Sequence, residues 1–189
     1  MNIDRHKAGR RALLAGLCAW AAQPLAAHAA TPGEVLVGQV LRDATLQGLN
    51  GPPRQLHSFR GKPLIINVWA SWCAPCRAEM ASLERLAWGD LAERFTVIGI
   101  STDDYIDRAQ SWLKRSNATL NHYLDRKLEM EYMLGATHLP LTVLVDAQGR
   151  VLEKVAGARE WDGPEARRLI EKHFPPPAPG ARKKGTRPA

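Results

Sequence analysis

Apolar residues in the middle of the chain form short runs, and polar stretches with helical periodicity separate them. Runs rich in β-branched residues at 63–68, 95–101 and 141–145 predict buried strands. Residues 77–87 are rich in Ala, Glu, Arg, Met and Leu, which favours a helix between the first two runs. This order predicts a βαβ unit with parallel strands and a right-handed crossover, and therefore an α/β domain.

A pair of carboxylates, Asp103 and Asp104, follows the second run. Apolar residues at helical spacing over 105–115 come directly after the pair. Adjacent carboxylates fit a helix cap and first turn better than a metal site. We therefore expect a helix to begin at this pair.

The pattern predicts four shorter elements toward the C-terminus. They are an edge strand at 121–124, a helix at 126–134 that ends at Gly135, a strand at 151–155 that pairs back through a Gly-containing loop, and a closing helix at 162–174.

Two short segments precede the first buried run. Residues 40–46 and 53–56 flank a turn rich in Gly, Asn and Pro at 47–52. We expect these segments to form a β-hairpin added ahead of the core, with residues 30–39 as an N-terminal lead.

Charge is distributed unevenly along the 189 residues, which carry a formal net charge of +7. The basic excess lies in 1–29 and 175–189, whereas the stretch between them holds equal numbers of acidic and basic residues. A nucleic-acid-binding domain should carry a basic face, so we expect no nucleic-acid partner. The length from 40 to 174 suits one domain with a sizeable core.

Residues 1–29 have the features of a signal peptide. They begin with basic residues, continue with an apolar stretch at 12–22 that is short for a membrane span, and end in small residues. This pattern predicts export to the periplasm and a mature start near Ala30. An uncleaved N-terminal anchor is the alternative, and Arg10-Arg11 leaves a twin-arginine route open.

The other end, 175–189, is rich in Pro and then in basic residues. Such a segment cannot continue a helix, so we expect a disordered tail.

Candidate chemistry lies at Cys73 and Cys76, between the strand run at 63–68 and the following helix. The predicted export would place them in an oxidising compartment, and we expect the third cysteine, Cys18, to be lost with the signal. Two residues between cysteines leave them close enough for a disulfide. Free N–H groups and the helix dipole stabilise a thiolate at a helix N-terminus. Pro75 suits the first turn, where its missing N–H costs nothing.

This arrangement predicts a dithiol–disulfide cycle. Cys73, nearer the helix end, is expected to be the exposed nucleophilic thiolate, and Cys76 the covered resolving thiol. Because the two thiols carry the redox chemistry, we expect no organic cofactor. A zinc site needs a second pair of ligands, which the histidine spacing does not supply, so we expect no metal.

The stretch 68–80 reads Val-Trp-Ala-Ser-Trp-Cys-Ala-Pro-Cys-Arg-Ala-Glu-Met. It resembles the active-site signature of thioredoxin-like proteins, and within them the exported TlpA/ResA-type thiol-disulfide oxidoreductases. The resemblance covers about 40–174 and includes Leu139-Pro140-Leu141-Thr142 before a later strand. It implies a thioredoxin fold, with a central mixed β-sheet flanked by helices and an added N-terminal β-hairpin.

The resemblance also implies roles for Leu139 and Pro140. In thioredoxin-like proteins the matching proline is cis and lies opposite the cysteine pair, so the backbone of Leu139 could pair with an extended substrate segment. The alternative is a proline that starts an edge strand. Members dedicated to cytochrome c maturation often carry Pro-Glu-Thr here, where this chain has Pro-Leu-Thr.

Glu79 is the candidate for proton handling. Thioredoxin has a buried acid in the first core strand, but this chain has Asn67 there, which cannot ionise. The resemblance implies that Glu79 lies in the active-site cavity and tunes thiol acidity, whereas helix spacing alone favours a solvated surface glutamate. We expect Trp72 to shape the surface that meets partners, and Trp69 and Trp88 to pack in the core or against helices.

These observations predict an exported thiol-disulfide oxidoreductase. The resemblance implies a reductant of protein disulfides in apocytochrome c or copper-site assembly proteins, recharged by a membrane thiol-transfer protein. Two alternatives stay open: a general disulfide oxidase or isomerase, and a non-catalytic module that holds Cu(I) between thiolates. Known Cys-x-x-Cys proteins span about −270 to −120 mV, so the motif leaves redox direction open. We expect a monomer.

Overall fold

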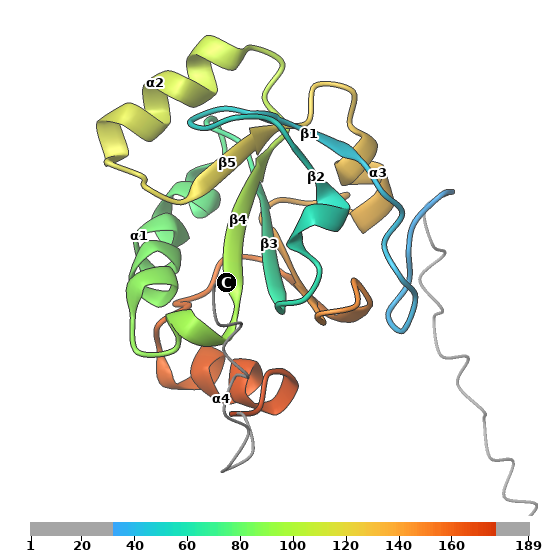
Figure 1. Cartoon of the computed structure of the whole chain (residues 1–189). Coiled ribbons are helices and arrows are strands. Elements are labelled where there is room, and N and C mark those ends of the chain that lie inside the picture. The colour runs from blue at the N-terminus through green and yellow to red at the C-terminus, as the bar shows by residue number, and fades with distance from the viewer. Residues whose placement is uncertain (1–31, 177–189) are drawn as a thin grey trace, which may run out of the picture.

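A computed structural model describes residues 32–176 of the chain (Figure 1). The predicted signal peptide at 1–29 and most of the predicted tail at 175–189 lie outside these residues.

A seven-stranded mixed sheet forms the centre of the molecule, in the order β2-β1-β5-β4-β3-β6-β7. The inner strands β3, β4 and β5 run parallel. Strand β1 pairs antiparallel with β5, β6 pairs antiparallel with β3, and β7 pairs antiparallel with β6. This confirms the predicted mixed sheet. The strands are β1 Thr45–Gly48, β2 Arg54–Gln55, β3 Leu64–Trp69, β4 Thr96–Ser101, β5 Asn121–Leu124, β6 Leu141–Val145 and β7 Val151–Ala156.

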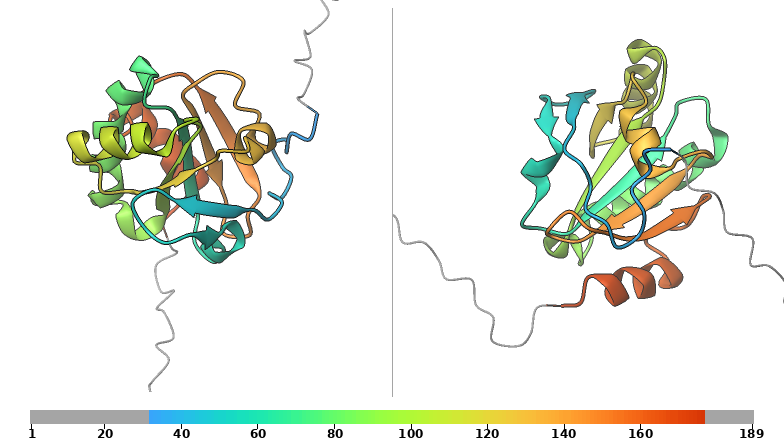
Figure 2. Two further views of the ribbon diagram at one scale, coloured as in Figure 1. Left: turned by 90° about the horizontal axis from the view of Figure 1, so that it is seen from above. Right: turned by 90° about the vertical axis from the view of Figure 1, so that its right-hand side faces the viewer.

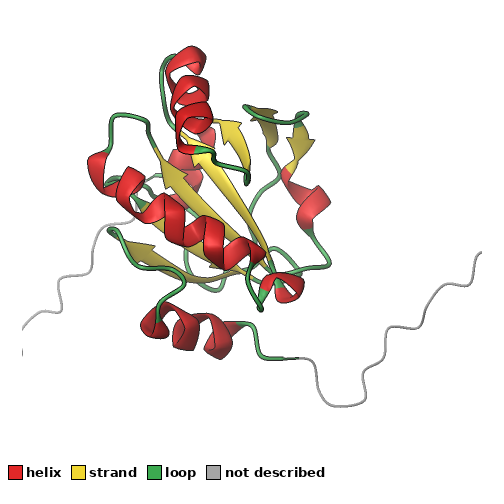
Figure 3. Ribbon diagram, turned by 90° about the vertical axis from the view of Figure 1, so that its left-hand side faces the viewer, coloured by secondary structure: helices red, strands yellow, loops and turns green. Residues whose placement is uncertain are grey.

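Helices cover both faces of the sheet. The four α-helices that the sequence predicted are α1 Ala74–Trp88, α2 Ile106–Ser116, α3 Glu129–Leu134 and α4 Pro164–His173. Two short 3₁₀ turns, η1 Leu56–Phe59 and η2 Ala92–Arg94, were not predicted. Apolar residues of α1, α2 and α4 share one buried cluster, whereas those of α3 and η1 belong to a second cluster. The left view of Figure 2 shows α1 in green and α3 in gold on opposite sides of the sheet, and Figure 3 faces the α1 side.

Strand β3 lies inside the sheet, between β4 and β6, and is buried along its whole length. Because successive side chains of a strand point to opposite faces, Ile65 and Trp69 join the cluster under α1, while Ile66 and Val68 join the cluster under α3. Asn67 shares the face of Ile65 and Trp69. The register of β3 therefore aims one polar side chain at the helix that follows the cysteines.

The prediction that 121–124 is an edge strand was wrong. Strand β5 has the predicted bounds, but it pairs with β4 on one side and with β1 on the other. The pair β1–β2, which is antiparallel through Thr45↔Gln55 and Leu46↔Arg54, extends the sheet beyond β5.

Two helices begin later than predicted. Helix α2 begins at Ile106, with Tyr105 as its N-cap, so the expected start at Asp103 was wrong. Helix α3 begins at Glu129 rather than at 126, because Leu128 takes a left-handed conformation with φ 58°. Its predicted end at Gly135 is confirmed, and this glycine adopts φ 71°, which favours Gly at a helix C-terminus.

The expected packing of Trp88 was also wrong. Its side chain is 69% exposed, because it lies at the last position of α1. The indole instead donates hydrogen bonds to Thr119 at 2.9 Å and to Glu84 at 3.3 Å.

Candidate functional site

The two cysteines lie at the junction of the central strand and α1. A turn follows the end of β3 at Trp69 and is closed by a hydrogen bond from Cys73 N to Ala70 O at 3.1 Å. Cys73 is the N-cap of α1, and its sulfur accepts a hydrogen bond from Cys76 N at 3.2 Å. Pro75 occupies the first turn, as predicted. The motif thus supplies its own helix cap through the sulfur of Cys73.

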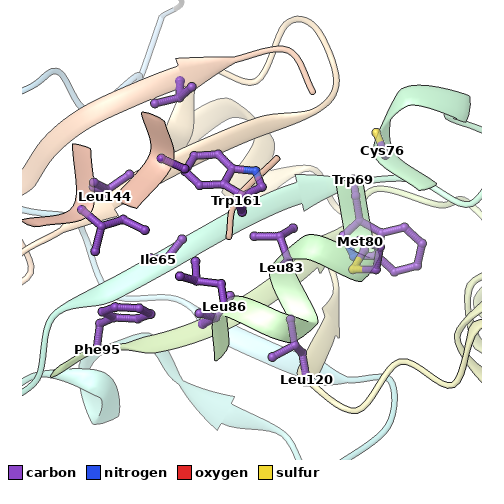
Figure 4. Close-up of a cluster of buried hydrophobic side chains, with 14 of the residues drawn as sticks. Ile65, Trp69, Cys76, Met80, Leu83, Leu86, Phe95, Leu120, Leu144 and Trp161 are labelled. Carbon is purple, nitrogen blue, oxygen red and sulfur yellow. The ribbon is translucent and has the colours of Figure 1, made fainter. Parts of the chain in front are cut away.

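Cys73 and Cys76 form a disulfide, with an S–S distance of 2.02 Å and a Cα–Cα distance of 5.3 Å. Cys76 is fully buried and Cys73 is 5% exposed. The expectation of an exposed Cys73 was therefore wrong for this oxidised form, because its side chain is bonded to buried Cys76 and packs in the core cluster. Figure 4 shows Cys76 near Trp69 and Met80 of this cluster.

A pocket of about 630 Å³ opens beside Cys73. It gathers three of the predicted site residues around this cysteine, namely Trp72, Pro75 and Leu139. Trp72 is 67% exposed, so its side chain lies at the surface beside the pocket. Sequence reasoning missed further lining residues: Thr102 and Asp104 after β4, Leu128 and Glu131 at α3, and Thr137 before β6.

Pro140 lies next to this pocket, in the loop that leads into β6. The Leu139–Pro140 peptide bond is cis. Pairing of β6 with β3 matches Leu141 with Val68 and Thr142 with Asn67. The start of β6 thus lies alongside the end of β3, from which the cysteine turn departs.

Glu79 is buried on the sheet-facing side of α1 and is 2% exposed. Its Oε1 accepts a hydrogen bond from Asn67 Nδ2 at 2.8 Å. Its Oε2 accepts one from Arg159 N at 3.0 Å and one from Trp161 Nε1 at 3.1 Å. The alternative of a solvated surface glutamate was therefore wrong.

Two opposing effects act on the Glu79 carboxyl. Burial raises its pKa above the ordinary value of a glutamate, and the hydrogen bonds from Asn67, Arg159 and Trp161 lower it, with a net rise. A group of this kind can exchange a proton at a higher pH than an exposed glutamate.

Asn67 connects Glu79 to the cis-proline strand. Its Nδ2 also donates to Thr142 Oγ1 at 3.0 Å, two residues beyond Pro140. Sequence reasoning missed both Thr142 and Trp161 as neighbours of Glu79. The strand register could have indicated Thr142, but nothing in the local sequence points to Trp161.

Behind the site, Trp69 is fully buried, as predicted. It contacts Trp112, with ring centroids 5.1 Å apart, and His122, with ring centroids 5.3 Å apart. Burial lowers the pKa of His122 to about 4, so this imidazole is neutral at neutral pH.

Within residues 32–176, no group of three or more His, Cys, Asp or Glu side chains could hold a metal ion. Over the same residues, no helix combines the length and apolar character that a membrane span requires.

Known proteins match the chain over the same region. Residues 37–154 match the AhpC/TSA family. The thiol:disulfide interchange protein DsbE of Vibrio cholerae is 33% identical over 133 residues, which cover 67% of this chain and 70% of that protein. The thiol-disulfide oxidoreductase ResA of Geobacillus thermodenitrificans is 27% identical over 123 residues, covering 65% of this chain and 71% of that protein.

A solved structure shows the same fold. The crystal structure of a Chlorobium tepidum protein, provisionally named thiol:disulfide interchange protein DsbE, superposes with a TM-score of 0.69 at 24% identity. The match covers 75% of this chain and 99% of that one. These matches confirm the predicted thioredoxin-like fold and the resemblance to thiol-disulfide oxidoreductases.

Proposed function

Because the chain belongs to the AhpC/TSA family and is a thiol-disulfide oxidoreductase of the DsbE and ResA type, we propose that it reduces disulfides of exported proteins in the periplasm. The observation that carries the proposal is the Cys73–Cys76 disulfide at the N-terminus of α1, with a pocket open at Cys73. Signal-peptide features at 1–29 support the periplasmic location.

The reaction is thiol–disulfide exchange in two steps. The Cys73 thiolate attacks one sulfur of the substrate disulfide, which breaks, and the released substrate thiolate takes up a proton. The Cys76 thiolate then attacks the Cys73 sulfur, so that the Cys73–Cys76 disulfide forms and the second substrate thiol leaves. Two electrons and two protons pass to the substrate, and the oxidised form described above is the product state of the protein.

In this scheme Cys73 is the nucleophile because it borders the pocket, whereas Cys76 is fully enclosed. The backbone of Leu139, ahead of cis Pro140, pairs with an extended substrate segment. Glu79 exchanges protons with the thiols, which the raised pKa of its carboxyl favours.

Each turnover oxidises the protein, so a donor must return two electrons. We assign this task to a membrane thiol-transfer protein. Apocytochrome c and copper-site assembly proteins are the proposed substrates, since the TlpA/ResA-type resemblance of residues 68–80 implies them. No organic cofactor takes part, and the proposed active form is a monomer.

The reduction potential of the Cys73–Cys76 pair tests the direction of the reaction. It is measured by tryptophan fluorescence against a dithiothreitol or glutathione series, with Trp69 and Trp72 next to the motif as reporters. We expect a value near or below that of thioredoxin, about −270 mV. A value near that of DsbA, about −120 mV, would identify an oxidant and refute the proposed direction.

A second assay separates catalysis from copper storage. The reduced protein should transfer its electrons to a small protein that contains one exposed disulfide, measured as free thiol released. Tight stoichiometric Cu(I) binding without such transfer would contradict the proposal.

A further inference from the structure

Asp103 is a buried carboxylate next to the active-site turn. It lies two residues beyond the end of β4 and is 1% exposed. Its Oδ2 accepts hydrogen bonds from Ser71 N at 2.8 Å and from Ser101 Oγ at 2.7 Å. Its Oδ1 accepts one from Ser71 Oγ at 2.6 Å. The side chain that was expected to cap a helix is thus directed at the cysteine loop.

Ser71 belongs to the turn that delivers Cys73. The turn runs from Ala70 to Cys73 and is closed by the bond from Cys73 N to Ala70 O. Both polar groups that Ser71 can donate, its amide and its hydroxyl, are bound to Asp103. A further bond from Thr102 N to Trp69 O, at 3.0 Å, attaches the same strand end to the start of the turn. Asp103 therefore helps to hold the turn that delivers Cys73.

The charge of Asp103 is not neutralised by a cation. Its donors are serine hydroxyls and one backbone amide, and no ion pair over residues 32–176 involves it. Burying an ionised carboxylate is unfavourable unless its hydrogen bonds compensate. A neutral side chain could hold the turn at a smaller desolvation penalty, so the negative charge requires its own explanation.

A negative charge in a poorly solvated place acts on nearby ionisable groups. It disfavours a second negative charge, which here is the thiolate of Cys73, two residues from Ser71. A thiolate that forms less readily makes the reduced pair less stable relative to the disulfide. The effect opposes that of the α1 N-terminus, which favours the thiolate.

We propose that Asp103 is a positioning residue for the thiol chemistry: it fixes the turn through Ser71, and its negative charge restrains the reactivity of Cys73. This inference rests on the proposed role of Cys73 as the nucleophile. It explains how a cysteine at a helix N-terminus keeps the reducing character that the proposed function needs.

Other charged groups lie around the active-site turn and form a constant background. Asp104, Glu131 and His138 line the pocket beside it. Glu79 lies on α1, and Arg77 Nη1 donates to Ser71 O at 3.4 Å. None of these side chains is altered in the variants below, so a change in Cys73 reactivity would report on Asp103.

The test compares two variants that change the same contact in opposite electrostatic senses. Asp103→Asn removes the charge but keeps the size and an acceptor for Ser71 N. Ser71→Ala keeps the charge and the backbone amide but removes one of the two hydroxyls that donate to the carboxylate. Asp107→Asn, the same change at an exposed residue of α2, is the matched control.

The readout is the alkylation rate of Cys73 in the reduced protein as a function of pH, with the modified residue mapped by mass spectrometry. We expect the pH midpoint of Cys73 alkylation in Asp103→Asn to lie about half a pH unit or more below the wild-type midpoint. We expect the midpoint of Ser71→Ala to move to higher pH, and that of Asp107→Asn to stay at the wild-type value.

An unchanged midpoint in Asp103→Asn would overturn the inference, even if the melting temperature fell. Shifts in the same direction for both variants would also overturn it, because simple loosening of the turn predicts that result. If Asp103→Asn does not fold, Ser71→Ala decides alone: a higher midpoint supports the inference, and an unchanged or lower one refutes it. Preferential alkylation of Cys76 in the wild type would instead refute the proposed nucleophile, and with it this inference.

Discussion

At the scale of single residues, the two cysteines differ in burial, and this difference predicts different chemical roles. Cys73 borders a pocket of about 630 Å³, whereas Cys76 is fully enclosed. A substrate disulfide can therefore approach only Cys73 without rearrangement of α1. Resolution of the mixed disulfide must come from within the protein.

Cys76→Ser should accumulate a mixed disulfide with substrate, because the first exchange proceeds and the second has no attacking thiol. The adduct is detected by non-reducing electrophoresis and mass spectrometry after incubation of the reduced variant with a disulfide-containing protein. Cys73→Ser is the matched control and should give no adduct. An adduct through Cys76 in that control would reverse the assigned roles.

Glu79→Gln should lower the pH midpoint of Cys73 alkylation, because the variant loses a buried group that carries a negative charge when ionised. The substitution should fold, since Asn67 Oδ1 has no hydrogen-bond partner and a flipped amide could accept from the new Gln side chain. Glu165→Gln, at an exposed position of α4, is the control and should leave the midpoint unchanged. If Glu79→Gln also leaves it unchanged, Glu79 plays no part in thiol acidity.

At the scale of elements, close packing between neighbouring strands supports the site from behind. Gly99 in the middle of β4 pairs with His122 of β5. A Cβ at Gly99 would lie 2.1 Å from His122 Nδ1 and 3.0 Å from Trp69 Nε1. The glycine is therefore needed for the close approach of the His122 ring.

Gly99→Ala should lower the free energy of unfolding by about 2–3 kcal/mol, since overpacking of a buried site forces neighbouring groups apart. Urea denaturation followed by circular dichroism measures the change. Gly51→Ala is the control, because its Cβ would lie 3.6 Å from Asn121 Oδ1, an ordinary contact. Equal effects of the two substitutions would contradict this account of Gly99.

Elements with a local sequence pattern could be predicted from the chain alone. The strand–cysteine–helix junction, the β-branched strands and the end of α3 at Gly135 each depend on residues that are close in sequence. The inner position of β5 could not be predicted, because it depends on pairing with a strand more than 70 residues away. Likewise, the hydrogen bond from Trp161 to Glu79 joins residues that are 82 positions apart in the sequence. The hydrogen bond from Ser71 to Asp103 joins residues that are 32 positions apart. Long-range contacts of this kind leave no local pattern.

At the scale of the whole molecule, the free energy of unfolding in acid sums contributions from titratable groups that act in opposite senses. His122 is 1% exposed, and burial lowers its pKa to about 4 from 6.5. The unfolded chain therefore binds a proton near pH 6.5 that the folded chain does not bind until about pH 4. The stabilisation is fully present above pH 6.5 and is lost as the pH falls toward 4.

Other groups contribute different pH dependences. The pKa of Asp90 is lowered by its hydrogen bonds to Arg167, so its contribution also disappears in acid, but the pair is exposed and screened by salt. The raised pKa of Glu79 acts in the opposite sense: its contribution is present at low pH and is lost as the pH rises through the folded-state value. A single acid-unfolding curve therefore cannot be assigned to one residue.

The His122 contribution is isolated by comparing the pH dependence of wild type with that of His122→Phe, which keeps an aromatic ring but cannot bind a proton. Between pH 7 and pH 4.5, the wild type should lose about 2–3 kcal/mol more free energy of unfolding than the variant. Urea titrations of the oxidised wild type and the oxidised variant at both pH values give four free energies of unfolding. Any packing defect of the variant cancels in this comparison, because it lowers the variant's free energy of unfolding at both pH values. Parallel losses would show that His122 is protonated equally readily in the folded and unfolded chain. Its enclosure between β4 and Trp69 would then not be tight enough to exclude a charge.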